Sequence, residues 1–234
     1  MSDILLKIEN LKKSFGKLEV LKGLTTDIRK GEVVVMIGPS GGGKSTFLRC
    51  MNLLEQPTEG SIVFEGIDIV KADETTKNHV RSEMGMVFQG SALFDSLTVL
   101  ENVMFPLDMF SNLTLRERQQ RARECLDRVN LSGAENKYPS EISGGMQKRV
   151  AIARAISQKP KYLFCDEPNS GLDPKTSLVI DELLSGITHE QGITTIINTH
   201  DMNSVLGIGE SILFIYKGHV EWTGNKDQVI GSTN

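Results

Sequence analysis

Runs of apolar residues alternate with segments of helical periodicity along most of this chain. Short strands are predicted at residues 4–11 and 18–28, with a turn at 14–17 between them. The continuous apolar run at 32–37 is typical of a strand buried on both faces, and a helix over about 44–54 follows it. Further strands are predicted at 61–64, 84–88, 162–165, 194–198 and 212–216.

The pattern is helical between about residues 91 and 159. Thr114 and Glu117 form a predicted capping box, after which Leu115, Ala122, Leu126 and Val129 recur at helical spacing. Another helix is predicted to begin at Ser143–Gly144, and a third covers about 174–190. We therefore expect an α/β fold with a mostly parallel sheet and a separate helical lobe. The chain is interpreted as one domain, 1–234, with an antiparallel β subdomain at its N-terminus.

Charge and hydropathy narrow the classes of function. The 26 basic and 30 acidic residues give a net charge of −4, whereas a nucleic-acid-binding domain usually has a basic excess. No stretch approaches about 18 consecutive apolar residues, so no membrane-spanning helix is predicted. We expect no nucleic-acid partner.

A glycine-rich loop joins the buried strand at 32–37 to the next helix. Its sequence GPSGGGKST comprises Gly38, Pro39, Ser40, Gly41, Gly42, Gly43, Lys44, Ser45 and Thr46. Such a loop between strand and helix presents backbone N–H groups to phosphate oxygens. Lys44 is expected to reach the β- and γ-phosphates of a nucleotide, and Ser45 to coordinate Mg²⁺. An ordinary glycine-rich turn is the alternative interpretation.

A pair of carboxylates ends the apolar run YLFC. Asp166 is expected to hold the hydration shell of Mg²⁺, and Glu167 to orient and deprotonate an attacking water. A solvated acidic loop is the alternative. The two motifs together are typical of nucleotide hydrolases.

The segment ISGGM, 142–146, distinguishes this chain from other phosphate-loop proteins. Ser143, Gly144 and Gly145 open a predicted helix, and the free N–H groups there suit an anion. Alone, this pattern is also typical of a plain helix cap. Phe15 is the candidate for stacking on the adenine ring, with a core aromatic as the alternative.

In order and spacing these motifs resemble those of ABC-transporter ATPases, over about residues 5–223. The resemblance implies that Gln89 senses Mg²⁺ and the attacking water, and that His200 contacts the γ-phosphate. It also implies that Asp173, in the segment SGLD, crosses between subunits. The implied assembly is a homodimer that sandwiches two ATP molecules, each phosphate loop facing Ser143 of the other subunit.

Within that family, the chain resembles the ATPase of Mla-type (Mce-associated) phospholipid transporters. ISGGM carries Met146 where most ABC ATPases have Gln, and the stretches 88–107 and 138–156 follow the same branch. The resemblance implies phospholipid transport between the membranes of a diderm bacterium. It implies a peripheral position on the cytoplasmic face of the inner membrane, an integral membrane permease, an Mce-type lipid-binding protein and a small accessory regulator.

The ATPase subunit of another kind of ABC transporter is the alternative interpretation. An amino-acid or methionine importer subunit would more often carry LSGGQ at the signature. The departures from the family pattern are Ile142 and Asn169, and the second leaves the hydrogen bonding of the loop after Glu167 undecided.

An apolar stretch after Gln89 is expected to receive a helix of the permease in a groove. It contains Leu93, Phe94, Val103, Met104, Phe105, Leu107, Met109 and Phe110. We expect most of these side chains to lie in the helical-lobe core and only some of them to line the groove.

Overall fold

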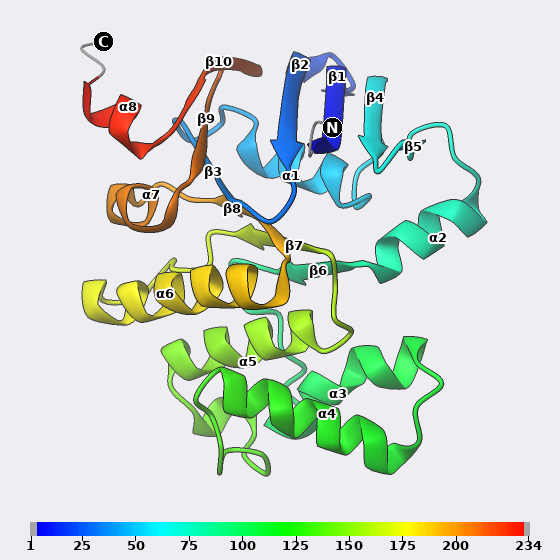
Figure 1. The fold of residues 1–234 in the computed structure, drawn as a ribbon, viewed down its shortest axis with the longest axis vertical. Helices are drawn as coiled ribbons and strands as arrows, with labels where there is room; N and C mark the ends of the chain where they lie inside the picture. The colour runs from blue at the N-terminus through cyan, green and yellow to red at the C-terminus, as the bar shows by residue number, and fades with distance from the viewer. Residues whose placement is uncertain (1–3, 232–234) are drawn as a thin grey trace.

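The computed structural model describes residues 4–231, which form two β-sheets and a set of helices (Figure 1). The predicted domain bounds of 1–234 extend past this range, so residues 1–3 and 232–234 lie outside the described part. The fold class predicted from the sequence is confirmed: an antiparallel sheet, a mostly parallel sheet and a group of helices follow one another in space (Figure 1).

The antiparallel sheet contains, in spatial order, β2 (Leu18–Arg29), β1 (Ile4–Phe15), β4 (Glu59–Phe64) and β5 (Ile67–Asp68). Alternating residues of β1 point to opposite faces, and Leu6 and Ile8 are fully buried. They share one core with Phe47 and Leu48 of α1 (Lys44–Met51). The small sheet thus supports the helix that follows the glycine-rich loop.

The larger sheet has six strands in the order β10, β9, β3, β8, β7, β6. Their bounds are β10 (His219–Gly224), β9 (Ser211–Tyr216), β3 (Val33–Ile37), β8 (Thr194–Asn198), β7 (Tyr162–Asp166) and β6 (Met84–Val87). All pairs are parallel except β10 with β9. Every residue of β7 and β8 is buried, which explains why both read as continuous apolar or small-residue runs.

The helical lobe consists of α3 (Val99–Phe110), α4 (Leu115–Arg128) and α5 (Gly144–Ile156). The predicted capping box between Thr114 and Glu117 is present at the start of α4. Ala122, Leu126 and Val129 are buried as expected, but Leu115 is exposed, so its assignment to the apolar face is wrong. Leu115 is the first residue of the helix and lies past the end of the packed face. The limits 91–159 for a separate lobe stay a prediction.

Several elements were not predicted. They are α2 (Glu74–Ser82), α7 (Met202–Ile208), α8 (Lys226–Gly231), the short 3₁₀ turn Pro139–Glu141, and strands β5 and β10. The long helix α6 (Pro174–Gln191) matches its prediction. Helix α1 ends at Met51 instead of residue 54, because the chain reverses at Leu53 with a positive φ of 62°. Among the described residues we find no helix with the length and apolar content needed to span a bilayer.

Candidate functional site

Three loops meet where β3, β7 and β8 end. These strands are adjacent and parallel, so their carboxyl ends lie at the same edge of the sheet. Asp166 at the end of β7 is in register with Asn198 at the end of β8, and Asn198 is in register with Met36 of β3. The glycine-rich loop, the carboxylate pair and the segment before His200 are thereby brought together.

Backbone geometry explains the glycines of the first loop. Gly38 has a φ of 143°, and a Cβ there would lie 2.0 Å from the backbone oxygen of Ile215. Gly43 caps α1 with a φ of 106°, and its Cβ would lie 2.9 Å from Leu21 Cδ2. Both positions exclude other residues, because a side chain would collide with β9 or β2 in addition to straining the backbone. The loop therefore brings bare backbone to the start of a helix, where anions bind.

Lys44 is held inside this loop. Its Nζ donates to the carbonyl oxygen of Gly38 at 2.8 Å and to that of Pro39 at 3.1 Å. Burial lowers the pKa of its ammonium group, and the carboxylates of Glu167 and Asp166 act in the opposite direction. The ammonium thus lies between the loop and the carboxylate pair, where a bound phosphate would receive its charge.

Ser45, Asp166 and Asn198 form a polar cluster beside the lysine. Ser45 Oγ donates to Asp166 Oδ1 at 3.1 Å, and Asn198 Nδ2 donates to the same carboxylate oxygen at 2.6 Å. Asn198 Nδ2 also lies 3.1 Å from Ser45 Oγ. Sequence reasoning missed Asn198, although a polar residue ending a fully buried strand beside β7 was a usable signal. Its Oδ1 is buried and has no hydrogen-bond partner among residues 4–231.

Glu167 occupies a strained position at the centre of the site. Its φ of 48° is in the left-handed region, which non-glycine residues seldom adopt. Gln89 Nε2 donates to Glu167 Oε2 at 3.1 Å, and His200 Nδ1 lies 3.3 Å from Glu167 Oε1. The side chains of Gln89 and His200 therefore both contact the carboxylate of Glu167. It does not bring the Gln89 side chain to Ser45 or Asp166 by any contact among the described residues.

Lys148 is a second residue that the sequence analysis missed. It is 5% exposed on α5, and its Nζ donates to the backbone oxygen of Gln89. Burial lowers the pKa of Lys148, while the charge of Glu167 raises it. A lysine in a helix gives no periodicity signal for such a contact, so only the structure places it behind the site.

Ser143, Asp173 and Phe15 lie around this centre without joining it. Ser143 caps α5, accepting from Met146 N at 3.3 Å, and α5 lies in the lower part of Figure 1, away from α1. Asp173 caps α6, and its hydrogen bonds to Thr176 lower its pKa. Phe15 is 47% exposed at the end of β1, with Lys13 Nζ 4.7 Å from its ring centroid. Nearly half of the surface of Phe15 is therefore exposed.

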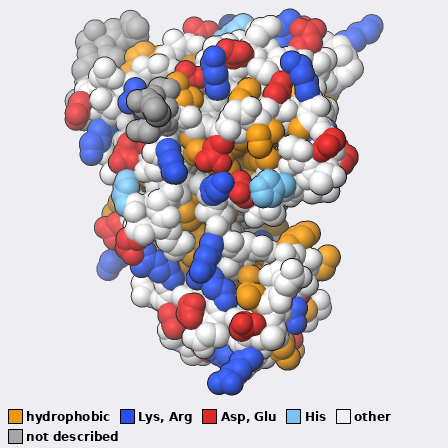
Figure 2. All heavy atoms as spheres, turned by 45° about the vertical axis from the view of Figure 1, so that its right-hand side comes forward, with side chains coloured by type: hydrophobic (Ala, Val, Ile, Leu, Met, Phe, Trp, Pro, Cys, Tyr) orange, Lys and Arg blue, Asp and Glu red, His pale blue; other side chains and the backbone are white. Residues whose placement is uncertain are grey.

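An apolar groove lies between the sheet and the helical lobe. Figure 2 shows hydrophobic side chains gathered near a hollow along the right-hand edge of that view. The lining includes Met84, Met86, Phe88, Phe94, Phe105 and Phe110. The rings of Phe94 and Phe105 are 4.6 Å apart. Val103, Met104 and Leu107 are buried in the core and Leu93 packs against it, which agrees with the core location expected for most of the apolar stretch.

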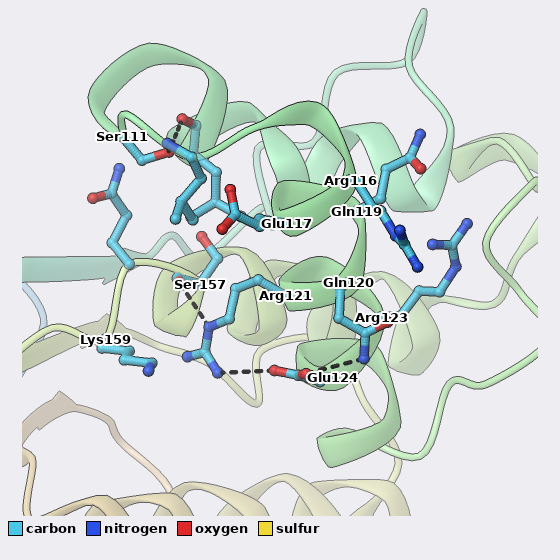
Figure 3. A pocket seen from close by; sticks show the side chains of 13 residues that line it. Ser111, Arg116, Glu117, Gln119, Gln120, Arg121, Arg123, Glu124, Ser157 and Lys159 are labelled. Atoms are coloured by element: carbon cyan, nitrogen blue, oxygen red, sulfur yellow. Dashed lines mark hydrogen bonds and ion pairs between the residues drawn. The ribbon is translucent and has the colours of Figure 1, made fainter.

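A polar depression on α4 is separate from these features (Figure 3). Arg116, Gln119 and Arg123 line one side, and Lys159 lies on the other. Arg121 donates to the carbonyl oxygens of Ser157 and Ile156, at 3.0 and 3.1 Å, and so caps the C-terminal end of α5. None of the residues that line this depression belongs to the carboxylate site or to the glycine-rich loop.

Comparison with known proteins accounts for this arrangement. A family model described as ABC transporter matches residues 21–170, more than half of the chain. The chain belongs to the ABC transporter family. The arginine transport ATP-binding protein of Bacillus subtilis is 42% identical over 221 residues, covering 94% of this chain and 91% of that relative. The glutamine transport ATP-binding protein of Escherichia coli is 42% identical over 228 residues, covering 97% and 93%.

Solved structures agree with the family assignment. A dimeric post-hydrolysis state of an ATP-binding cassette bound to ADP and Pi has a TM-score of 0.86 and 36% identity, covering 95% of this chain and 99% of that one. The ABC protein described here is therefore an ATPase that binds ATP. The relatives are named for amino-acid transport, so the narrower resemblance to Mla-type phospholipid transporters is not confirmed.

Proposed function

We propose that the carboxylate site hydrolyses ATP with Glu167 as the general base. The observation that carries this is the convergence of Gln89 and His200 on the Glu167 carboxylate, next to the glycine-rich loop. A carboxylate in this position accepts the proton of a water aligned with the terminal phosphate, while the loop amides and Lys44 hold the phosphates. Phe15 stacks on the adenine ring.

The polar cluster fits a magnesium ion. Asp166 and Ser45 supply oxygen ligands of the kind that Mg²⁺ prefers, and the unpartnered Asn198 Oδ1 leaves further oxygen capacity beside them. When bound, the ion would neutralise charge on the phosphates. Asp166 and Ser45 would hold the ion or its water shell, and Gln89 is the third proposed ligand.

Glu167→Gln tests the assignment of the base. The amide keeps the shape of the side chain but cannot accept a proton, so turnover should fall by about 10²-fold or more. ATP affinity should change by less than about threefold, since the phosphate loop is untouched. Phosphate release and fluorescent-nucleotide titration measure the two effects on the purified chain.

The matched control is Glu182→Gln, which makes the same change on the exposed face of α6 and should leave turnover intact. Near-normal hydrolysis by Glu167→Gln would reject Glu167 as the base.

The proposed assembly is a two-fold dimer coupled to an integral membrane permease at the cytoplasmic face of a membrane. Ser143 caps α5, Gly144 and Gly145 open it, and this helix lies apart from α1, which follows the phosphate loop (Figure 1). We therefore propose that they meet a nucleotide when a second copy supplies the loop. Asp173 lies in the segment that follows Glu167 and would cross to the partner. The apolar groove receives a helix of the permease.

We further propose that the complex imports a polar amino acid. The support is identity to arginine and glutamine transport subunits over nearly the whole chain. Phospholipid transport is the second candidate, favoured by Met146 in the signature, and it would add an Mce-type protein and an accessory regulator. Reconstitution with the cognate permease separates them: stimulation of ATP hydrolysis by an amino acid with its binding protein supports import, and stimulation by phospholipid supports the second candidate.

A further inference from the structure

Asn169 is a buried amide in the loop after Glu167. It is 8% exposed and lies two positions beyond that carboxylate, immediately before Ser170. Its Nδ2 donates to Asp181 Oδ1 at 2.7 Å and to Ser204 Oγ at 3.1 Å. Both partners are also buried, at 3% and 1% exposure. One side chain therefore joins the loop to two helices.

The two helices belong to different parts of the site. Asp181 lies on α6, which begins directly after the loop, whereas Ser204 lies on α7, which begins two residues after His200. The amide of Asn169 thus ties the segment that carries Glu167 to the segment that carries His200, with Asp181 as their common anchor. Burial raises the pKa of Asp181, and the bonds from Ser204 and Asn169 stabilise its charged form.

The backbone around Asn169 has little freedom. Glu167 N donates to Asn198 O at 2.8 Å, Ser170 N to Glu167 O at 3.1 Å and Leu172 N to Asn169 O at 3.2 Å. The positive φ of Glu167 must be maintained by such surroundings, because the residue does not prefer it. A change at Asn169 would therefore be passed directly to the Glu167 carboxylate and to Ser170, which accepts from Gln89 Nε2 at 3.2 Å.

The amide of Asn169 is hydrogen-bonded on one side only. Asn169 Oδ1 is buried and has no hydrogen-bond partner among the described residues, which is unfavourable. An apolar side chain of similar size would remove this unpaired acceptor but would also remove a donor to the buried Asp181 carboxylate. The nitrogen of the Asn169 amide donates two hydrogen bonds, and these fix the position of the loop relative to α6 and α7.

We propose that Asn169 is a positioning residue for ATP hydrolysis, which holds the Glu167 loop and the His200 segment in one fixed arrangement through Asp181 and Ser204. The inference rests on the proposed role of Glu167 as the base. Asn169 touches neither nucleotide nor water in this scheme and acts through Glu167.

The test compares Asn169→Ala with Thr188→Val in the purified full chain. Thr188 is also a buried hydrogen-bonding residue, bound to Leu184 O on α6 and to Thr195 Oγ1, away from the site. Asn169→Ala should lower kcat at least about tenfold and change the KM for ATP less than about threefold. Thr188→Val should lower the melting temperature similarly but leave kcat within about twofold. Asn169→Thr, whose hydroxyl restores one bond to Asp181, should recover part of the rate.

A second comparison places Asn169→Ala in the Glu167→Gln background. If Asn169 acts through Glu167, the added change should lower the residual rate by less than about twofold. An equal tenfold loss in both backgrounds would overturn the inference, as would a normal kcat in Asn169→Ala alone. Should Asn169→Ala not fold, Ser204→Ala removes one acceptor and is expected to lower kcat about threefold, and an unchanged kcat would overturn the inference.

The same variants distinguish a failure of the proposed function from a failure of this inference. Near-normal turnover in Glu167→Gln alone rejects the base, and with it the residue that Asn169 is proposed to position. Loss of turnover in Glu167→Gln together with normal turnover in Asn169→Ala rejects only the inference.

Discussion

At the scale of single residues, the site depends on positions with a specific steric or hydrogen-bonding requirement. Gly38 is such a position, because both its backbone conformation and the neighbouring β9 exclude a side chain. Asn198 is another, since its amide supports Asp166 at the end of a neighbouring strand. The first is evident from a sequence motif, but the second requires the two strands to be adjacent.

Gly38→Ala should therefore damage both stability and nucleotide binding. The methyl group meets the Ile215 carbonyl and the backbone keeps a conformation that alanine does not favour, which together should cost at least about 1 kcal/mol of unfolding free energy. Urea unfolding and ATP titration measure the two effects.

Gly186→Ala provides the control. This glycine lies inside α6, where an added Cβ would meet only ordinary contacts, so alanine should stabilise the chain by about 0.5–1 kcal/mol. A Gly38→Ala protein as stable as the wild type and able to bind ATP would contradict the steric argument.

At the scale of elements, helix α4 was predictable from its sequence and helix α2 was not. Helix α4 has both a capping box and an apolar stripe, so its start was predicted correctly. Helix α2 has Asp73 as its cap, which accepts from Thr76 N at 2.7 Å, but only Val80 is buried on it. A single buried residue gives no periodicity. Strand β10 does alternate exposed and half-buried residues, a signal that the sequence analysis missed.

Thr114→Ala should lower the stability of the chain by about 0.5–2 kcal/mol, because it removes the acceptor for the N–H of Glu117. The measurement is the free energy of unfolding in urea. Thr75→Ala, an exposed threonine in the first turn of α2, should change it by less than about 0.5 kcal/mol. Equal effects of the two substitutions would mean that the capping box contributes nothing.

At the scale of the whole molecule, the apolar groove predicts how the chain is held by its permease. Phe110 is 73% exposed, so its truncation to alanine should leave the stability of the isolated chain nearly unchanged. Phe94 is 43% exposed and contacts Phe105, so its truncation should cost about 0.5–1.5 kcal/mol of stability. If a permease helix buries these rings, each truncation should cost about 2 kcal/mol of binding, which weakens assembly more than tenfold. Co-purification and thermal melting measure the two quantities.

Leu178→Ala, an equally exposed leucine on α6, should affect neither quantity. Unchanged assembly in both phenylalanine variants would reject the groove as the docking site.

In the proposed dimer, each ATP site combines the phosphate loop of one subunit with Ser143 of the other. With Lys44→Ala and Ser143→Arg on different subunits, only one of the two composite sites is damaged, whereas both are damaged when one subunit carries both changes. Mixed dimers of the first kind should keep substantial ATP hydrolysis, and those of the second should lose nearly all of it. Equal rates would show that Ser143 does not act on the partner's nucleotide.

The sequence by itself determined the strand–loop–helix unit around the glycine-rich loop, the carboxylate pair and the alternation of strands and helices. Those features depend on short-range properties, namely glycine conformations, helix caps and the hydrophobic period. The tertiary structure alone decided that Asn198 supports Asp166, that Lys148 contacts Gln89, and that Asn169 joins two helices. Those contacts join residues far apart in the chain, and they exist only because parallel strands end at one edge of the sheet and helices pack against that edge.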